Sequence, residues 1–383
     1  MIEPRINGLE IFVVEVSSRG NWIFIELKAD FGLTGIGEAS HGCGFSKASV
    51  GDDAVMRRHI ERLYHFIEGQ SPFAIESFRQ RAWKKATASG LAAVTAFSGL
   101  EQAMCDLAGK AEGVPIYQLL GRKVHDTIPV YANINRATTH RTPDGFAANA
   151  EEAAQEGFHA IKVAPFDDFP RLDSNTDEIE LALEKGIARV EAIRKAVGND
   201  IGLMVDCHSK FNRELGTRAA QLLAGINLDW YEEPVAPERL EDTIAIRQSI
   251  SQRLASGEVL FGREEFKPLC RNHAVDVIMP DIKHCGGIFE AKQIALLAES
   301  FSVEVSPHNP SGPVSTVASA QLSATLNNFA ILEYAWGEVA WRNTLTSPAE
   351  RLENGALHLT DEPGLGCQLS RKIVEEHCAC SHK

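Results

Sequence analysis

The chain has no long apolar run, and this absence excludes one class of protein. No stretch of about 18 apolar residues occurs among its 383 residues, so the sequence predicts no membrane-spanning helix and no membrane partner. The opening residues, Met-Ile-Glu-Pro-Arg, do not have the basic and apolar regions of a signal peptide. We therefore expect a cytoplasmic protein.

Positive charge is also scarce. Lys and Arg number 38 against 52 Asp and Glu, which gives a formal net charge of −14 at pH 7, and no run of Lys or Arg appears. A nucleic-acid-binding face needs clustered positive charge, so the sequence excludes nucleic acid as a partner. The negative total does not exclude an anionic substrate, because a bound cation reverses the local field.

The eight cysteines form no regular framework. In a cytoplasmic protein such cysteines are expected to be free thiols. The C-terminal segment His377-Cys378-Ala-Cys380-Ser-His382 contains residue types that bind a soft metal. It follows the last recognisable element, however, so we expect a frayed tail there rather than a metal site.

The length of the chain, 383 residues, suits a barrel of roughly 250 residues together with a smaller domain. Its first part contains three expected strands followed by three expected helices. The strands are residues 8–16, 22–28 and 34–38, and the helices are residues 51–69, 74–87 and 92–112. Strands grouped ahead of helices indicate an α+β domain, which we place at residues 1–121.

From Ile128 onward, strands and helices alternate. The expected strands are residues 129–133, 160–163, 203–206, 228–232, 254–258, 275–281, 302–306 and 330–333. The expected helices include residues 143–156, 176–197, 216–224 and 239–251. Eight alternating strands favour a closed (β/α) barrel of the TIM type, and hence an α/β fold. We place the barrel at residues 122–340 and a C-terminal segment at 341–383.

Three of these strands end in a carboxylate at a regular interval. Asp206, Glu232 and Glu258 are spaced by 26 residues, one strand-helix-strand unit. Successive strands of such a barrel deliver their terminal side chains to one rim. A single acid of this kind is more often a solvated loop residue, but three at matching strand ends predict a site for a hard divalent cation.

Other strand ends carry polar residues as well. Alternate residues of a strand share a face, so Asp206 and His208 should face one pocket, whereas Glu233 should face away from Glu232 and is the weaker ligand candidate. The last three strands end in Asp281, His308 and Glu333.

Together these residues resemble the mandelate racemase branch of the enolase superfamily over nearly the whole chain. Within the branch, Asp206-Cys-His208 and Ser306-Pro-His308-Asn-Pro-Ser-Gly-Pro313 are most similar to acid-sugar dehydratases of the D-galactonate dehydratase type. The resemblance is specific because its motifs occur in order and at barrel spacing. The other motifs are Gly35-Ile-Gly-Glu38, Ser98-Gly-Leu-Glu-Gln-Ala-Met-Cys-Asp106-Leu-Ala-Gly-Lys110, Lys162, Trp230-Tyr-Glu232-Glu-Pro, Ala255-Ser-Gly-Glu258, Pro280-Asp281 with Gly286-Gly-Ile, Glu333 and Glu362-Pro-Gly-Leu-Gly366.

The resemblance implies a modified (β/α)7β barrel with an α+β capping domain, to which the tail returns through residues 362–366. It also implies one Mg²⁺ per subunit, held by Asp206, Glu232 and Glu258 and bound to the substrate carboxylate. The α-proton of a carboxylate has a pKa far above that of any side chain. The enediolate formed by its removal therefore needs electrostatic stabilisation.

The resemblance also implies roles for four further residues. His308 is the expected base, with Asp281 hydrogen-bonded to its far nitrogen. A histidine between two prolines is equally suited to capping a loop, but an aspartate one strand earlier favours catalysis. Lys162 is expected to neutralise the substrate carboxylate and Glu333 to donate a hydrogen bond to it. A salt bridge across the barrel is the alternative for these two residues.

One departure from the family favours elimination over racemisation. Where many relatives carry Lys-x-Lys, this chain has Lys162-Val-Ala164, so the second lysine, often a base on the opposite face, is missing. His208 is suited to protonating a leaving hydroxyl group, with orientation of the metal site as its alternative role. The sequence therefore predicts a Mg²⁺-dependent hydro-lyase that converts an aldonate to a 2-keto-3-deoxy acid. A cycloisomerase or epimerase using the same enediolate, and a non-catalytic metabolite-binding protein, are the alternatives.

The small-molecule sugar acid is less well defined. The resemblance places its selection in capping loops at residues 17–22 and 38–50 and in the segment after the last strand. His41, Trp22 and Trp336 are the candidate contacts, although aromatic residues in such places are more often packing residues. The first loop is short, so the pocket is either open or completed by a neighbouring subunit, and we expect a homo-oligomer between a dimer and an octamer.

Overall fold

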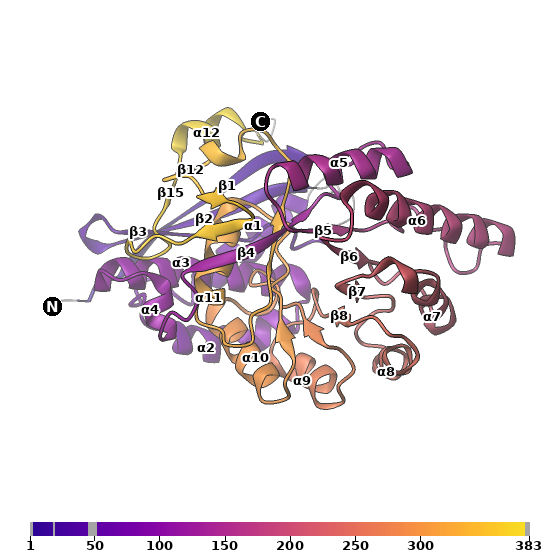
Figure 1. The fold of residues 1–383 in the computed structure, drawn as a ribbon. Coiled ribbons are helices and arrows are strands. Elements are labelled where there is room, and N and C mark those ends of the chain that lie inside the picture. Colours follow the sequence, from indigo (N-terminus) through magenta and orange to yellow (C-terminus); the bar gives the residue numbers. More distant parts are fainter. Residues whose placement is uncertain (1–2, 18–19, 45–51, 380–383) are drawn as a thin grey trace.

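The computed structural model describes residues 3–17, 20–44 and 52–379, which form a capping domain beside a barrel (Figure 1). In the cap, three antiparallel strands lie in the order β1 (Ile6–Ser17), β2 (Gly20–Ala29) and β3 (Thr34–Glu38). A 3₁₀ turn, η1 (Asp30–Gly32), joins the last two strands. The helices that follow are α1 (Asp52–Tyr64), α2 (Ile75–Thr87), α3 (Leu91–Glu112) and α4 (Ile116–Leu120).

Helix α3 is the central element of the cap, because it packs against the sheet on one side and the barrel on the other. Its residues 93–109 are all buried. Two glycines of β3 allow this packing: a Cβ on Gly35 would lie 2.3 Å from the Ala103 carbonyl oxygen, and one on Gly37 would lie 2.1 Å from that of Gly99. The motif Gly35-Ile-Gly is therefore explained by close approach of strand and helix.

The barrel contains eight parallel strands. They are β4 (Thr127–Asn133), β5 (Ala160–Val163), β6 (Gly202–Asp206), β7 (Trp230–Glu232), β8 (Leu254–Ser256), β9 (Val277–Ile278), β10 (Glu304–Val305) and β11 (Leu332–Ala335). Neighbouring strands pair from β4 to β10, β11 pairs with β4, and a bridge between Val305 and Phe329 joins the last gap. The predicted closed barrel is confirmed, although several strands are shorter than expected.

Seven helices connect these strands and cover the outside of the barrel (Figure 1). They are α5 (Pro143–Gln155), α6 (Thr176–Val197), α7 (Arg213–Leu222), α8 (Leu240–Ser249), α9 (Arg263–Arg271), α10 (Ile288–Glu299) and α11 (Pro313–Ser323). Helix α7 begins three residues before the predicted start, because the Asn212 side chain accepts the Leu215 N–H and caps it. A 3₁₀ turn, η2 (Ala224–Ile226), follows α7. Eight strands with seven helices between them match the predicted (β/α)7β barrel.

The C-terminal segment lies against both parts of the molecule. Strand β14 (Ala356–His358) pairs with β13 (Leu352–Glu353) and β4, and β12 (Thr346–Ser347) pairs with β15 (Gln368–Leu369). Gly364 then bridges to Pro115 of the cap, and the Leu365 N–H donates to Asp106 of α3 at 2.7 Å. The remaining elements are η3 (Arg342–Thr344) and α12 (Arg371–Glu376).

Helix α3 also holds the loop between β9 and α10. That loop contains Asp281 and Gly286-Gly287, and a Cβ on Gly287 would lie 2.2 Å from Glu101 Oε2. Glycine is therefore required where the loop meets the helix. The hydrogen bonds join Thr95 Oγ1 to His284 Nδ1 at 2.8 Å, the Gly286 N–H to Ser98 Oγ at 3.2 Å, and the N–H groups of Ile288 and Phe289 to the Glu101 carboxylate at 2.7 and 2.9 Å.

The sequence predicted no membrane-spanning helix and predicted free cysteine thiols. Within the described ranges, no helix has the length and apolar character needed to cross a bilayer. Five cysteines are buried free thiols: Cys105, Cys207, Cys270, Cys285 and Cys367. In the C-terminal Cys/His segment, Cys380 and His382 lie outside the described residues, as do residues 18–19 and 45–50 of the two expected substrate loops.

Candidate active site

A cavity of about 810 Å³ opens at the carboxyl ends of the barrel strands. Of the residues expected to act there, Lys162, His208, Glu258 and His308 line it. Asp206 and Glu232 lie behind them, 2% and 1% exposed. The structure therefore brings the expected metal ligands and the expected proton-transfer residues to one site.

The three predicted ligands come from adjacent strands, but they are not equivalent. Asp206 and Glu232 end β6 and β7 and face each other in register, and Glu258 lies two residues beyond β8. Ligand atoms of Asp206, His208 and Glu258 lie within 4.8 Å of one another. Glu232 instead accepts hydrogen bonds from Lys162 Nζ at 2.9 Å and Trp230 Nε1 at 3.1 Å.

Burial and mutual repulsion control the charge of these acids. Burial, followed by the charge of Asp206, raises the pKa of Glu232 well above its usual value. Burial acts in the same direction on Asp206, but the charges of His208 and Lys162 outweigh it and hold the pKa of Asp206 below its usual range. Asp206 therefore favours its ionised form, whereas Glu232 favours its protonated form.

Lys162 lies at the centre of this carboxylate cluster, 1% exposed. Its Nζ is 2.9 Å from Glu232 Oε1, 3.2 Å from Glu333 Oε1 and 3.4 Å from Asp206 Oδ2. Burial lowers the pKa of Lys162, but these carboxylates outweigh burial and raise the pKa well above its usual value. Lys162 is therefore a fixed positive charge.

Glu333 differs from its expected role as a hydrogen-bond donor. Its oxygens accept from Asn133 Nδ2 at 2.6 Å and from the Asn309 N–H at 2.8 Å. Burial raises the pKa of Glu333, but the charges of Lys162 and His308 lower it below its usual value. An ionised carboxylate only accepts hydrogen bonds, so Glu333 orders its neighbours here rather than donating to a ligand.

His308 and Asp281 form the expected pair. His308 Nδ1 lies 2.9 Å from Asp281 Oδ2, and its Nε2 lies 3.0 Å from Glu258 Oε2. Burial lowers the pKa of His308, but the charges of Glu258 and Glu333 reverse this effect and raise the pKa to about 10. Asp281 also accepts from Lys283 Nζ at 2.6 Å, a buried partner that no sequence motif indicated.

His208 has a partner that sequence reasoning missed. Its Nδ1 lies 2.5 Å from Asp167 Oδ1, and its Nε2 lies 3.1 Å from Asp206 Oδ2. Burial lowers the pKa of His208, but the charges of Asp206 and Asp167 outweigh it and raise the pKa well above its usual value. His208 is therefore held in its protonated form. Asp167 follows β5 in an irregular segment, where no periodic pattern marks it.

Asp206 and His208 reach the same site, but the prediction that they do so as alternate residues of one strand is wrong. Strand β6 ends at Asp206, and His208 has a φ of 44°, so side-chain alternation does not extend to it. Glu233 is a similar case, because its φ of 39° turns it into the cavity, where Gly257 N–H donates to it at 3.1 Å. Burial, then the charge of Glu258, raises the pKa of Glu233 to about 7.

The three candidate substrate contacts have different environments. His41 is buried and accepts hydrogen bonds from Arg136, which lines the cavity. Trp22 is fully buried and packs edge-on against Trp341 with ring centroids 5.7 Å apart, so it has no surface to offer a substrate. Trp336 is 7% exposed, and its Nε1 donates to Glu156 at 2.6 Å. The two tryptophans are packing residues.

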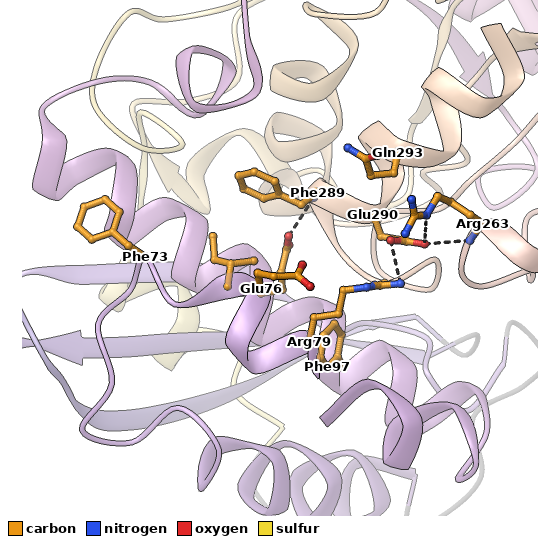
Figure 2. A pocket seen from close by; sticks show the side chains of 11 residues that line it. Phe73, Glu76, Arg79, Phe97, Arg263, Phe289, Glu290 and Gln293 are labelled. Atoms are coloured by element: carbon orange, nitrogen blue, oxygen red, sulfur yellow. Dashed lines mark hydrogen bonds and ion pairs between the residues drawn. The ribbon is translucent and has the colours of Figure 1, made fainter. Parts of the chain in front are cut away.

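A second cavity, of about 410 Å³, lies between helices α2, α3, α9 and α10 (Figure 2). Glu290 pairs there with Arg79 at 2.9 Å and with Arg263 at 3.4 Å. The figure shows Arg79 and Arg263 directed at Glu290, whereas the aromatic ring of Phe289 points away from them. None of the residues expected to act in catalysis lines this cavity, so we place the active site at the barrel mouth.

Two family models match most of the chain. Residues 10–121 match the model described as the mandelate racemase / muconate lactonizing enzyme N-terminal domain. Residues 145–373 match the model described as enolase C-terminal domain-like.

Individual relatives extend this match over nearly the full length. A D-xylonate dehydratase of Haloferax volcanii is 31% identical over 369 residues, which cover 93% of this chain and 85% of the relative. A D-galactonate dehydratase of Verminephrobacter eiseniae is 28% identical, with 93% and 90% covered. The crystal structure of a mandelate racemase/muconate lactonizing enzyme from Sulfitobacter sp. superposes with a TM-score of 0.88 at 28% identity, covering 99% of this chain and 97% of the other.

Proposed function

The chain belongs to the mandelate racemase / muconate lactonizing enzyme family, and on that premise we propose that it is a Mg²⁺-dependent dehydratase of aldonates. Such an enzyme removes the α-proton and the β-hydroxyl group and forms a 2-keto-3-deoxy acid. The observation that carries the proposal is a pair of Asp-held histidines at one carboxylate cluster, His308 with Asp281 and His208 with Asp167.

The names of the relatives support the substrate class. They are named D-xylonate, D-gluconate/D-galactonate and D-galactonate dehydratases. These acids differ in length and stereochemistry, but each is an aldonate. We therefore propose the class rather than one member of it.

The residues present fit a divalent cation. Asp206, Glu232 and Glu258 provide buried carboxylate oxygens from three adjacent strand ends, the donor type that Mg²⁺ prefers. Burial, followed by the charge of Asp206, raises the pKa of Glu232, and a bound cation would oppose both effects. When bound, the cation would supply electrostatic stabilisation to the substrate carboxylate as the α-proton leaves.

Lys162 and His308 would act at the reacting carboxylate and its α-carbon. Lys162 supplies a fixed positive charge beside the carboxylate cluster. Asp281 holds Nδ1 of His308, so Nε2 is the nitrogen that faces the cluster. A cation held by Glu258 would offset the charge that raises the pKa of His308 and leave Nε2 able to accept the α-proton. Residue 164 is alanine, so a second lysine is not present on this strand to act from the other face.

His208 would protonate the departing hydroxyl group. Asp167 fixes its Nδ1, and the two neighbouring carboxylates keep the ring protonated, the form that a general acid needs. In the described arrangement Nε2 points to Asp206. Delivery of the proton from Nε2 therefore requires the substrate hydroxyl to replace that contact.

A single experiment tests the reaction class. Purified protein with Mg²⁺ is incubated with a panel of sugar acids, and 2-keto acid formation is followed together with the mass of the product. We expect loss of one water from at least one aldonate. A product of unchanged mass would replace the dehydratase with an epimerase or a cycloisomerase.

A further inference from the structure

We propose that Arg136 recognises the end of the substrate remote from the reacting carboxylate, and that Glu338 restricts this end to a neutral hydroxyl group. The inference rests on the proposed dehydratase function. It means that the site selects aldonates, which carry one carboxylate, over aldarates, which carry a second carboxylate at the remote end.

Arg136 and Glu338 meet because β4 and β11 are neighbours. Asn133 pairs with Ala335 in register, and each charged residue follows three positions beyond this pair. The Arg136 guanidinium forms an ion pair with Oε1 of Glu338, and Ser17 Oγ of the cap donates to the same oxygen at 3.3 Å. The pair therefore joins two strand ends to the capping domain.

His41 of the cap completes this cluster. Its Nε2 accepts hydrogen bonds from Nη1 and Nη2 of Arg136, each at 3.3 Å. Burial, followed by the charge of Arg136, lowers the pKa of His41 well below its usual value, so the ring is neutral. Glu338 is then the carboxylate that pairs with Arg136 among the described residues.

Arg136 lies on the side of the cavity towards which the substrate extends from its reacting carboxylate. Asn133, at the end of β4, donates to Glu333, which is an ion-pair partner of Lys162. Arg136 lies further along the same wall of the cavity and lines it beneath the cap. A substrate whose carboxylate lies near Lys162 therefore extends its carbon chain along this wall towards Arg136.

The chemistry of the pair favours a hydroxyl group. A guanidinium has five N–H donors, more than Glu338 and His41 occupy, so donors remain for a substrate oxygen. The Glu338 side chain is 1% exposed, pairs with Arg136 and accepts a hydrogen bond from Ser17, and its Oε2 has no hydrogen-bond partner among the described residues. Its role is to balance charge. A second carboxylate beside Arg136 would have to compete with Glu338 for the guanidinium and would be repelled by the Glu338 carboxylate.

The experiment compares kcat/KM for a six-carbon aldonate and its matching aldarate, D-gluconate with D-glucarate or D-galactonate with galactarate. We expect Glu338→Gln, which has the same shape but no charge, to raise the aldarate-to-aldonate ratio at least tenfold. Glu338→Asp keeps the charge and should retain the wild-type ratio. We expect Arg136→Gln to raise KM for the aldonate at least tenfold with a smaller change in kcat.

Lys210, a cation that lines the cavity from the loop after β6, provides the matched control. Lys210→Met should leave the ratio at its wild-type value, whatever it does to each rate. An unchanged ratio in Glu338→Gln, with an unfolding midpoint like that of the wild type, overturns the inference.

Binding measurements keep this test separate from the proposed function. Calorimetry with Mg²⁺ gives the ratio of the two dissociation constants for the wild type and Glu338→Gln without any turnover. If no sugar acid is dehydrated, the dehydratase proposal fails. The shift in the binding ratio still decides whether Glu338 selects against a second carboxylate.

Discussion

Replacing Glu101 by glutamine should change how the stability of the protein depends on pH. Glu101 lies on α3 and is 2% exposed, and its two oxygens accept the N–H groups of Ile288 and Phe289 at 2.7 and 2.9 Å. Burial raises the pKa of this carboxyl from 4.5 to about 7, although the two N–H donors favour the ionised form. The native structure therefore holds a proton that the unfolded chain releases at lower pH.

The sign of the effect follows from linkage. Because the folded pKa is the higher one, the native state binds more protons than the unfolded state between pH 4.5 and about 7. The free energy of unfolding therefore falls as the pH rises through this window. Between pH 5 and 8 the loss is about 2–3 kcal/mol, since one pKa unit corresponds to about 1.4 kcal/mol. Glutamine does not titrate, so Glu101→Gln removes this loss.

Thermal unfolding midpoints of wild type and Glu101→Gln, measured from pH 5 to 8, provide the assay. Other titrating groups cancel in the difference between the two proteins. In a chain of this size the predicted change corresponds to a relative gain of about 3 °C by the variant as the pH rises. The glutamine accepts only one of the two N–H groups, so a constant loss of about 1–3 kcal/mol is added at every pH.

A matched control and a clear contrary result complete the test. Glu76 lines the cavity of Figure 2 and is exposed, so Glu76→Gln should give a pH profile parallel to that of the wild type. Parallel profiles for Glu101→Gln as well would refute the reasoning, because they would mean that burial does not hold a proton on this carboxyl.

Three further predictions concern the barrel mouth. Asp206→Asn, Glu232→Gln and Glu258→Gln should each weaken Mg²⁺ binding with the fold intact, and calorimetric titration with undiminished affinity in all three would contradict the assigned ligands. His308→Asn should stop the exchange of the substrate α-proton for deuterium in D₂O, which proton NMR measures. Exchange at the wild-type rate would indicate another base. In His208→Asn the rate of dehydration should fall by a factor of about 10²–10⁴ while exchange of the α-proton continues, because only the general acid is removed. Normal dehydration by that variant would remove His208 from the mechanism.

The barrel and its rim were predictable because both depend on periodic features. Parallel strands of a closed barrel end at one rim, so a polar residue after each apolar run indicates a position in space as well as in sequence. This reasoning located Asp206, Glu232 and Glu258 on adjacent strands, and it placed Asp281 beside His308. It also predicted eight strands that alternate with helices, and the resemblance to the family added the (β/α)7β arrangement.

The residues that were missed lie where the backbone departs from a regular element. Asp167, Arg136 and Glu338 follow strand ends in segments whose course depends on tertiary packing, and no local pattern marks them. Glu233 and His208 reach the cavity through positive φ values of 39° and 44°, which side-chain alternation does not anticipate. Trp22 was misassigned because its fully buried environment depends on contact with Trp341, more than 300 residues later in the chain.

The difference in exposure between the two histidines supports the role of general acid proposed for His208. Both have Nδ1 held by an aspartate and Nε2 beside a carboxylate of the cluster. The His308 side chain is 4% exposed, whereas that of His208 is 31% exposed. A general acid loses its proton to the departing hydroxyl group in every turnover and must recover one, and exposure gives His208 a direct route to solvent protons.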